Sequence, residues 1–414
     1  MVTHNVFLMH TELKRLNRIP AIILHAAFMG IFLIAANSQA QPAKGATKFF
    51  GNICGNSVRS DFLTYWNQIS PENSAKWASV EGTQDRYNFG GIDAMRNFAD
   101  SNHISWKLHT LIWGSQYPNW ITKLSQAEQL AEITEWYDTL AKRYPTVTQI
   151  DVINEGYPSH KPPPFKAALG GDGSTGYDWI VKSFKMARER WPNATLIYND
   201  YNNIEWNSEV SWTVTMVNAI KKAGAPIDAI GCQAHDAHRT ATNTLKSNLD
   251  KLASTGLPLY ITEFDIPDGN DASQKTKMQD KVTLFWNHPK VLGITYWGYI
   301  VGQTWVSGSG LLSSSGTARP ALTWLIDYLK SNPKPPNDFP TGTISPDAPF
   351  VTPSPAAAML SDQGYWQIFD LRGRVTGAYQ VNDRLNSFSS RMPKTGCFVV
   401  KHTGRSAGII TTVR

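Results

Sequence analysis

The chain has 414 residues, a formal net charge of +6, and 15 Trp, 15 Tyr and 17 Phe. This length accommodates one large domain with an appendage, or two or three ordinary domains. Residues 1–40 contribute +2 and residues 357–414 contribute +5, which leaves −1 for residues 41–356. The positive charge therefore lies at the two ends, and the main body has no electrostatic basis for binding nucleic acid.

The first 40 residues have the composition of a secretory signal peptide. Basic residues between positions 14 and 18 precede an apolar stretch at 19–36, and SQA (38–40) provides a small-x-small cleavage site. The alternative is an uncleaved membrane anchor, although the stretch is at the short end of the ~17–25 residues that span a bilayer. We expect a secreted protein, extracellular or at a bacterial cell surface, with no membrane association after removal of the signal peptide.

Between residues 46 and 332, short apolar runs alternate with longer amphipathic segments. The runs are KFFGNI, NQIS, ISWKLHT, QIDVIN, ATLIYND, DAIGCQ, PLYITEF and GITYWG. The segments between them include 125–144, 177–191 and 209–224, where apolar residues recur at helical spacing. Strands that alternate with helices pair in parallel, because parallel neighbours need a crossover connection.

Eight such units predict a (β/α)₈ TIM barrel formed by residues 41–332, in agreement with the ~250 residues that this fold typically takes. An open, doubly wound sheet is the alternative. The barrel is favoured because run after run ends in a reactive side chain, and barrel active sites are built at the C-terminal ends of the strands.

The remainder of the chain differs in composition. Residues 333–356 contain eight prolines and predict an extended linker. Residues 357–414 show strand-like alternation that is broken by glycines, which predicts a small basic β module.

Three cysteines, Cys54, Cys232 and Cys397, cannot all pair within one chain. Cys54 and Cys232 lie in apolar, strand-like contexts, where buried free thiols are the simpler interpretation.

Two carboxylates at strand ends carry the chemistry. Glu155 closes DVINE and Glu263 closes LYITE, 108 residues apart, which equals three units of 36. In a barrel of eight similar units this spacing places them on the fourth and seventh strands, facing the same mouth. Either one alone could be a solvated or helix-capping group. Paired carboxylates across a cleft are what cleavage of a glycosidic bond requires.

Seven motifs together resemble glycoside hydrolase family 10, the endo-1,4-β-xylanases. They are PENSAKW (71–77), KLHTLIWGSQYPNWI (107–121), DVINE (151–155), YNDYN (198–202), IGCQAH (230–235), ITEFDI (261–266) and ITYWG (294–298). The resemblance covers roughly residues 46–332 and follows the order of the family. It implies that Glu155 is the general acid/base and Glu263 the nucleophile, with retention of anomeric configuration.

Three further residues support these catalytic roles. Asn154 suits a hydrogen bond to the sugar 2-hydroxyl, which strengthens in an oxocarbenium-like transition state. His235 and Asp265 are expected to orient Glu263 and keep it ionised, while a less polar pocket raises the pKa of Glu155.

The resemblance also implies residues that bind xylan and xylo-oligosaccharides. Their hydroxyl-binding groups and stacking indoles are Glu72, Asn73, Lys76, His109, Trp113, Gln233, Trp297 and Trp305. Trp77 is the tryptophan most expected in the core. We expect a monomer with no cofactor and no metal; HDAH (235–238) has metal-ligand residue types, but His235 ends a strand and cannot share a helical turn with His238.

Some positions depart from the family pattern. Gly114 stands where a histidine usually follows the tryptophan, Phe264 replaces the usual leucine, and YIVGQTW lacks an acidic residue. These differences affect the sugar subsites and leave every catalytic group in place.

Alternative functions remain open at this point. The barrel could cleave β-glucan or mannan, or it could be a non-catalytic xylan-binding protein. The 357–414 module loosely resembles sorting tails of secreted bacterial polysaccharide-degrading enzymes, the favoured interpretation, but Tyr365, Trp366 and Tyr379 could instead stack on carbohydrate.

Overall fold

The computed structural model describes residues 41–338 and three later strands at 365–370, 375–380 and 398–402. The predicted signal peptide, residues 339–356 of the predicted linker and the rest of the C-terminal module lie outside the described residues, as does Cys397. Within the described part of the chain, none of the helices combines the length and the apolar character needed to cross a membrane.

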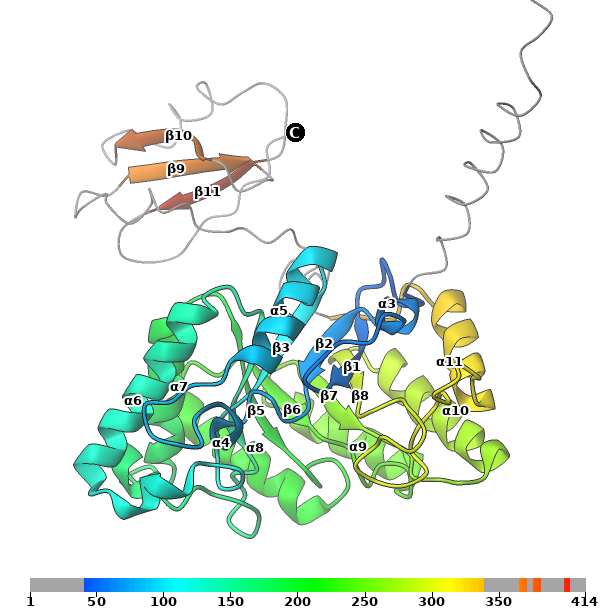
Figure 1. Cartoon of the computed structure of the whole chain (residues 1–414), viewed down its shortest axis with the longest axis horizontal. Coiled ribbons are helices and arrows are strands. Elements are labelled where there is room, and N and C mark those ends of the chain that lie inside the picture. The colour runs from blue at the N-terminus through cyan, green and yellow to red at the C-terminus, as the bar shows by residue number, and fades with distance from the viewer. Residues whose placement is uncertain (1–40, 339–364, 371–374, 381–397, 403–414) are drawn as a thin grey trace, which may run out of the picture.

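Eight strands form the centre of the main body (Figure 1). They are β1 (Phe49–Cys54), β2 (Gln68–Pro71), β3 (Ser105–Trp113), β4 (Gln149–Asn154), β5 (Thr195–Asp200), β6 (Ala229–Cys232), β7 (Leu259–Phe264) and β8 (Val291–Tyr296). Each strand pairs in parallel with the next, and β1 pairs with β8 through Phe49 and Gly293, so the barrel is closed. The predicted (β/α)₈ barrel is confirmed, and the open sheet is wrong.

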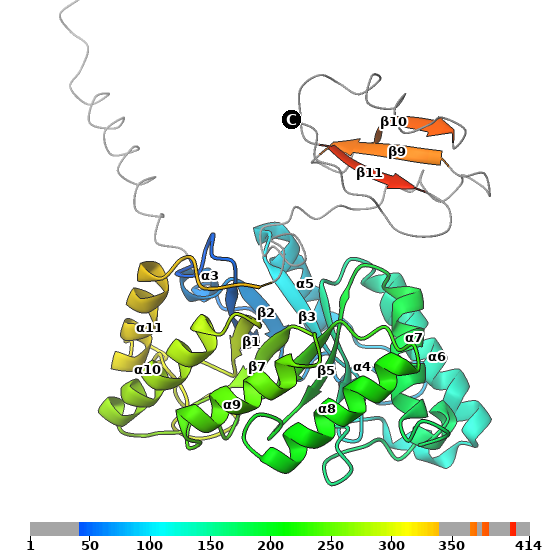
Figure 2. The same ribbon diagram turned by 180° about the vertical axis from the view of Figure 1, so that it is seen from behind.

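Helices surround this barrel, as the views from the two sides show (Figures 1 and 2). They are α3 (Phe62–Tyr65), α4 (Trp77–Val80), α5 (Gly90–Asn102), η1 (Asn119–Lys123), α6 (Gln126–Arg143), η2 (Lys166–Leu169), α7 (Asp178–Arg190), α8 (Asn207–Lys222), α9 (Thr242–Ala253), α10 (Asp271–Asn287) and α11 (Pro320–Ser331).

Local sequence sets where several helices begin. Ser125 and Glu128 form a reciprocal capping box at the start of α6, which satisfies amide groups that have no partner inside the helix. The Asn270 side chain accepts a hydrogen bond from the Ser273 amide at the start of α10, and Pro320 occupies the first turn of α11.

Aromatic and aliphatic side chains fill the barrel near the beginnings of its strands. Phe49 and Tyr260 stack there with ring centroids 5.7 Å apart, and Ile197, Ala229 and Leu292 complete the cluster. Gly293 leaves room for this packing, because a Cβ at that position would lie 2.2 Å from the Phe49 ring. Because side chains fill this end of the barrel, we expect the functional site at the opposite end, where the strands terminate.

Beyond the barrel, β9 (Tyr365–Asp370), β10 (Val375–Gln380) and β11 (Phe398–His402) form an antiparallel sheet in the order β10-β9-β11. These strands lie within the segment predicted as a small β module. The stacking role of Tyr365, Trp366 and Tyr379 stays a prediction, because their side chains lie outside what the structure describes.

Candidate active site

Strands β4 and β7 position the two carboxylates. Glu155 follows the last residue of β4, in the left-handed backbone region with φ +56°, and its amide donates to the Asn199 carbonyl at 2.9 Å. Glu263 lies within β7, and its amide donates to the Gln233 carbonyl at 3.1 Å. A non-glycine residue with positive φ is strained and often marks a functional position.

A chain of side-chain amides connects these carboxylates. The Gln233 amide donates to Glu155 Oε1 at 3.2 Å and to Asn154 Oδ1 at 3.3 Å. The Asn199 amide donates to the same Asn154 oxygen and to Glu263 Oε1, both at 2.8 Å. Residues from β4, β5 and β7, together with Gln233 just after β6, therefore meet in one hydrogen-bonded network, and Glu155 and Glu263 belong to the same site.

His235 and Asp265 lie beside Glu263, as the sequence predicts. His235 Nε2 is 3.4 Å from Glu263 Oε2, and His235 Nδ1 is 2.9 Å from Asp265 Oδ2. Burial alone would lower the pKa of His235, but its hydrogen bonds to Asp265 and Glu263 raise it to about 10. The protonated His235 ring donates hydrogen bonds from both of its nitrogens to carboxylates, and His238 Nδ1 hydrogen-bonds to the His235 carbonyl. In HDAH these ring nitrogens are therefore engaged in hydrogen bonds within the protein.

The environment shifts the pKa values of the two carboxylates in opposite directions. Burial raises the pKa of Glu155, and the negative charge of Glu263 adds to this effect. Burial would also raise the pKa of Glu263, but the basic neighbours His109, His235 and Lys107 lower it to about 2. Glu155 is thus suited to hold a proton, while Glu263 is ionised at every physiological pH.

The predicted sugar-binding residues of β2 and β3 gather at the same mouth. Lys76 Nζ donates to Asn73 Oδ1 at 3.0 Å and lies 4.9 Å from the centre of the Trp113 ring. Burial lowers the pKa of Lys76, whereas the charges of Glu263, Glu72 and Glu155 act to raise it. Lys76 therefore lies within electrostatic reach of both proposed catalytic carboxylates. Burial also raises the pKa of the half-buried Glu72.

The remaining aromatic residues line the mouth from β3 and β8. The His109 ring lies 5.5 Å from the Trp297 ring in an edge arrangement, and its Nδ1 is 2.8 Å from Asp151 Oδ2. Trp305 is 58% exposed and donates from Nε1 to Asp265 Oδ2 at 2.8 Å. Its indole face is available to a ligand.

Two predictions about buried side chains are confirmed. Trp77 is buried and stacks on Trp136 with centroids 5.4 Å apart. Cys54 and Cys232 are buried free thiols.

Sequence reasoning missed the residues that hold the loop after Glu155. The Lys161 amide donates to the Glu155 carbonyl at 3.0 Å, and the Tyr157 amide donates to Asp200 Oδ2 at 3.0 Å. The His160 ring bridges two carboxylates, with Nδ1 2.7 Å from Asp200 and Nε2 3.2 Å from Glu209. These contacts fix the conformation of the segment that carries the proposed acid.

Asn199 and Asp200 were also missed as site residues, although YNDYN contains both. The available signal was their position: two polar residues end an apolar run, as Asn154 and Glu155 do. The contribution of His160 could not be found this way, because its partners are 40 and 49 residues away in the chain.

Gly114 has a structural reason for departing from the family pattern. Its amide donates to the Lys161 carbonyl at 2.8 Å, and a Cβ on Gly114 would lie 2.3 Å from that oxygen and 2.5 Å from the Pro162 carbonyl oxygen. The loop after Glu155 occupies the space that a side chain at position 114 would need.

A closed (β/α)₈ barrel whose mouth holds two carboxylates of opposite pKa shift, amide groups and exposed indole defines the class of barrel glycosidases. The comparisons with known proteins agree. The chain belongs to glycosyl hydrolase family 10, whose family profile matches residues 36–328.

Individual relatives give the degree of similarity. Endo-1,4-beta-xylanase B of Cellvibrio japonicus is 44% identical over 287 residues, which cover 69% of this chain and 46% of that protein. The chain thus spans about half the length of this relative. The crystal structure of xylanase 10B from Thermotoga maritima matches with a TM-score of 0.62 and 27% identity, over 70% of this chain and 97% of that one. The xylobiose complex of xylanase 10B from Thermotoga petrophila RKU-1 matches with a TM-score of 0.63 and 26% identity, over 70% and 96% of the two chains.

Proposed function

We propose that this protein is a secreted, retaining endo-1,4-β-xylanase that hydrolyses internal β-1,4-xylosidic bonds of xylan. The observation that carries the proposal is a pair of carboxylates, linked through side-chain amides, in which burial raises the pKa of Glu155 while basic neighbours lower that of Glu263. Family membership and the xylanases among the relatives support xylan as the substrate.

The reaction proceeds in two displacements. Glu155 donates its proton to the glycosidic oxygen while a Glu263 oxygen attacks the anomeric carbon, so the bond to the leaving sugar breaks and a glycosyl ester forms. Glu155, now ionised, takes a proton from water, whose oxygen attacks the anomeric carbon and releases Glu263 as a carboxylate. Two inversions at one carbon retain its configuration.

The neighbouring residues hold these groups for both steps. The Gln233 and Asn199 amides orient Glu155 and Glu263, and the Asn154 oxygen accepts from both amides. The Asn154 amide donates to Glu155 Oε1 at 3.3 Å, and its second N–H is the group proposed to reach the sugar 2-hydroxyl. His235 donates to Glu263 and keeps it ionised before attack. Trp305 offers an indole face on which a sugar ring can stack.

The test is the release of short xylo-oligosaccharides from xylan. Glu155→Ala and Glu263→Ala should each abolish it, while azide should restore activity to Glu155→Ala on a substrate with a good leaving group. Full activity in either variant would refute the assigned roles.

The alternative functions are separated by simple measurements. A panel of xylan, β-glucan and mannan distinguishes a xylanase from another barrel β-glycanase, and an absence of reducing-sugar release from all three would favour a non-catalytic xylan-binding protein.

Secretion, a monomeric state and a sorting role for residues 357–414 belong to the same proposal. The composition of residues 1–40 supports secretion. Deletion of residues 357–414 should lower the yield of secreted protein without reducing pull-down on insoluble xylan; unchanged secretion with lost pull-down would favour carbohydrate binding. Light scattering of the purified protein tests whether it is monomeric.

A further inference from the structure

His160 lies in the loop that connects β4 to η2 and carries the proposed acid/base. The loop folds back on its own beginning, because the Lys161 amide donates to the Glu155 carbonyl at 3.0 Å. The His160 side chain is only 4% exposed, and its ring stacks on the Tyr201 ring with centroids 3.6 Å apart. Histidine is the side chain that most readily changes charge near neutral pH, so the charge of this buried ring matters for the loop around it.

Both ring nitrogens of His160 face carboxylates. Nδ1 lies 2.7 Å from Asp200 Oδ1, and Nε2 lies 3.2 Å from Glu209 Oε2. An ionised carboxylate can only accept hydrogen bonds, so both contacts are favourable only when both nitrogens carry a proton. A neutral ring would present a lone pair to one of the two carboxylates. The Asp200 and Glu209 side chains are 2% and 5% exposed, so solvent screens this repulsion little.

The contact with Glu209 depends most on the charge of the ring. It is the longer of the two contacts, and His160 is the one ionic partner of the buried Glu209 Oε2 within the described part of the chain. Asp200 Oδ1 also accepts a hydrogen bond from the Tyr201 amide at 3.0 Å. When the ring loses one proton, we therefore expect Nδ1–H to stay on Asp200 and the Nε2 lone pair to face Glu209.

Asp200 connects the ring to the rest of the loop. Its Oδ2 accepts hydrogen bonds from the Tyr157 amide at 3.0 Å and from the Tyr198 hydroxyl at 2.6 Å. Asp200, at the end of β5, thus holds the loop both at Tyr157 and at His160. Repulsion of the neutral ring by Glu209 would disturb this segment, which directly follows the proposed acid.

The ionisable groups near the ring come from its own loop, from the end of β5 and from α8, and they are Glu155, Tyr157, Asp200, Tyr201 and Glu209. Burial would lower the pKa of His160, but the three carboxylates raise it above its ordinary value of 6.5. Burial also raises the pKa of Tyr201 to about 12, so this neighbour stays neutral over the range in which histidine titrates. The ring is therefore charged at neutral pH and loses its charge in alkaline solution.

We propose that His160 is a positioning residue for Glu155: its doubly protonated ring holds the loop in place, and the loop is released when the ring loses one proton. The inference rests on the proposed function and adds an alkaline limit to it. This limit differs from the titration of Glu155 itself, because release of the loop misplaces the carboxyl group whether or not it carries a proton.

The second displacement of the proposed reaction isolates this effect. Glu155 acts there as a base and must be ionised, so its own titration favours this step as the pH rises. On a dinitrophenyl xylobioside the first displacement needs no proton, so the second limits kcat, which a burst of dinitrophenolate verifies. A decrease of kcat in alkaline solution then reports a misplaced base. Azide attacks the glycosyl enzyme without a base, so formation of the azide product is the internal reference.

Two variants separate the charge of the ring from its packing. The wild type should lose about tenfold in kcat in alkaline solution, with its midpoint at the pH where the His160 ring titrates in NMR spectra. His160→Gln has no ring charge and should show the low rate at every pH. Glu209→Gln places an amide at Nε2, which accepts from the charged ring and donates to the neutral one. It should stay within about threefold of the wild-type neutral rate and lose the alkaline decrease.

His288→Gln is the matched control. His288 is also buried, and its Nε2 lies 3.1 Å from Asp250 Oδ1, but it follows α10 and precedes β8, at the opposite end of the barrel from the carboxylates. This variant should match the wild type in kcat at every pH. Thermal melts at each pH establish that each variant is folded where its rate is measured.

Other results would overturn the inference. Wild-type rates in His160→Gln, or an alkaline decrease that persists in Glu209→Gln, would show that the ring charge does not position Glu155. An equal decrease in the azide reaction would show that the whole site is lost in alkaline solution. A lower melting temperature of His160→Gln with an unchanged pH dependence of kcat would show a structural role alone. Failure of the wild type to release dinitrophenolate would instead refute the proposed function.

Discussion

Gly114→Ala tests whether the loop after Glu155 positions the proposed acid. The new Cβ would lie 2.3 Å from the Lys161 carbonyl oxygen and 2.5 Å from that of Pro162, and both are backbone atoms. Restoring an ordinary contact of about 3.4 Å requires the loop to move by roughly 1 Å. Overpacking of this kind costs about 1–3 kcal/mol of stability, and a displacement of about 1 Å at a catalytic group can lower the rate about 100-fold.

The assay exploits the need for protonation. The leaving sugar of a xylo-oligosaccharide is a poor leaving group and must be protonated by Glu155. The dinitrophenolate of a dinitrophenyl xylobioside departs without protonation. The variant should lose about 100-fold in kcat/KM on the oligosaccharide but much less on the aryl substrate. Gly269→Ala is the control, because a Cβ there meets no atom within 4 Å. Wild-type rates on the oligosaccharide, or equal losses on both substrates, would refute the positioning argument.

Three further substitutions probe the surrounding groups. Burial would lower the pKa of His160, but Asp200 and Glu209 raise it above the unfolded-state pKa of 6.5. The ionic contacts of His160 therefore stabilise the fold fully below pH 6.5, and this stabilisation is lost as the pH rises through the raised pKa. His160→Gln should therefore lower the free energy of unfolding by about 2 kcal/mol at acid pH and by little at alkaline pH; a pH-independent difference in urea melts would contradict this. Burial raises the pKa of Glu205 from 4.5 to about 7, so the wild type should lose stability, about 3 kcal/mol, as pH rises through this range. Glu205→Gln should abolish that loss in thermal melts, and a preserved pH slope would contradict the assignment. Trp305→Phe keeps an aromatic face but removes the hydrogen bond to Asp265, so it should lower kcat on xylo-oligosaccharides about tenfold with a smaller change in KM; a change in KM alone would indicate that the hydrogen bond is not used.

The periodicity of the sequence predicted the elements well where the pattern is local. Segments predicted as helical at 125–144 and 177–191 correspond to α6 (Gln126–Arg143) and α7 (Asp178–Arg190). The placement of Glu155 and Glu263 at the same end of the barrel could be predicted because strand ends can be recognised from apolar runs, and the closed barrel brings those ends together.

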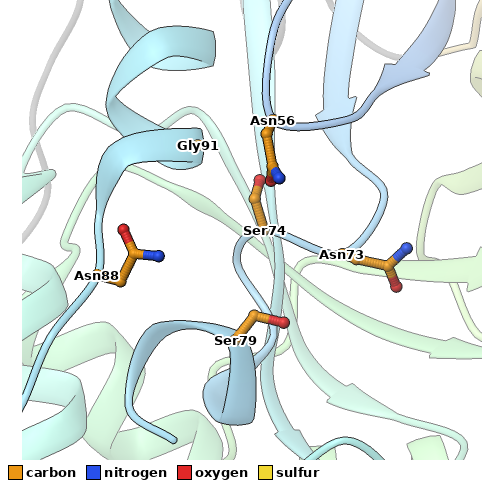
Figure 3. Close-up of a pocket in the computed structure, with 6 residues that line it drawn as sticks. All are labelled: Asn56, Asn73, Ser74, Ser79, Asn88 and Gly91. Carbon is orange, nitrogen blue, oxygen red and sulfur yellow. The ribbon is translucent and has the colours of Figure 1, made fainter.

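Contacts between distant loops were not predictable in the same way. His160 lies in a segment with no periodic pattern, and its function depends on Asp200 and Glu209, which other units of the barrel supply. A pocket lined in part by Asn56, Ser74 and Gly91 (Figure 3) likewise depends on the packing of the connections after β1 and β2 against α5. Such sites arise from the shape of the assembled loops, on which a single sequence carries no local signal.

The electrostatic coupling of the two carboxylates also explains how one residue could serve both steps of the proposed reaction. The negative charge of Glu263 contributes to the raised pKa of Glu155, which favours a protonated acid before attack. When Glu263 becomes a glycosyl ester it loses that charge, so this contribution disappears and the pKa of Glu155 falls. Glu155 is then more readily ionised at the moment when it must accept a proton from water. The amide chain through Gln233, Asn154 and Asn199 keeps the two groups in place during this exchange of roles.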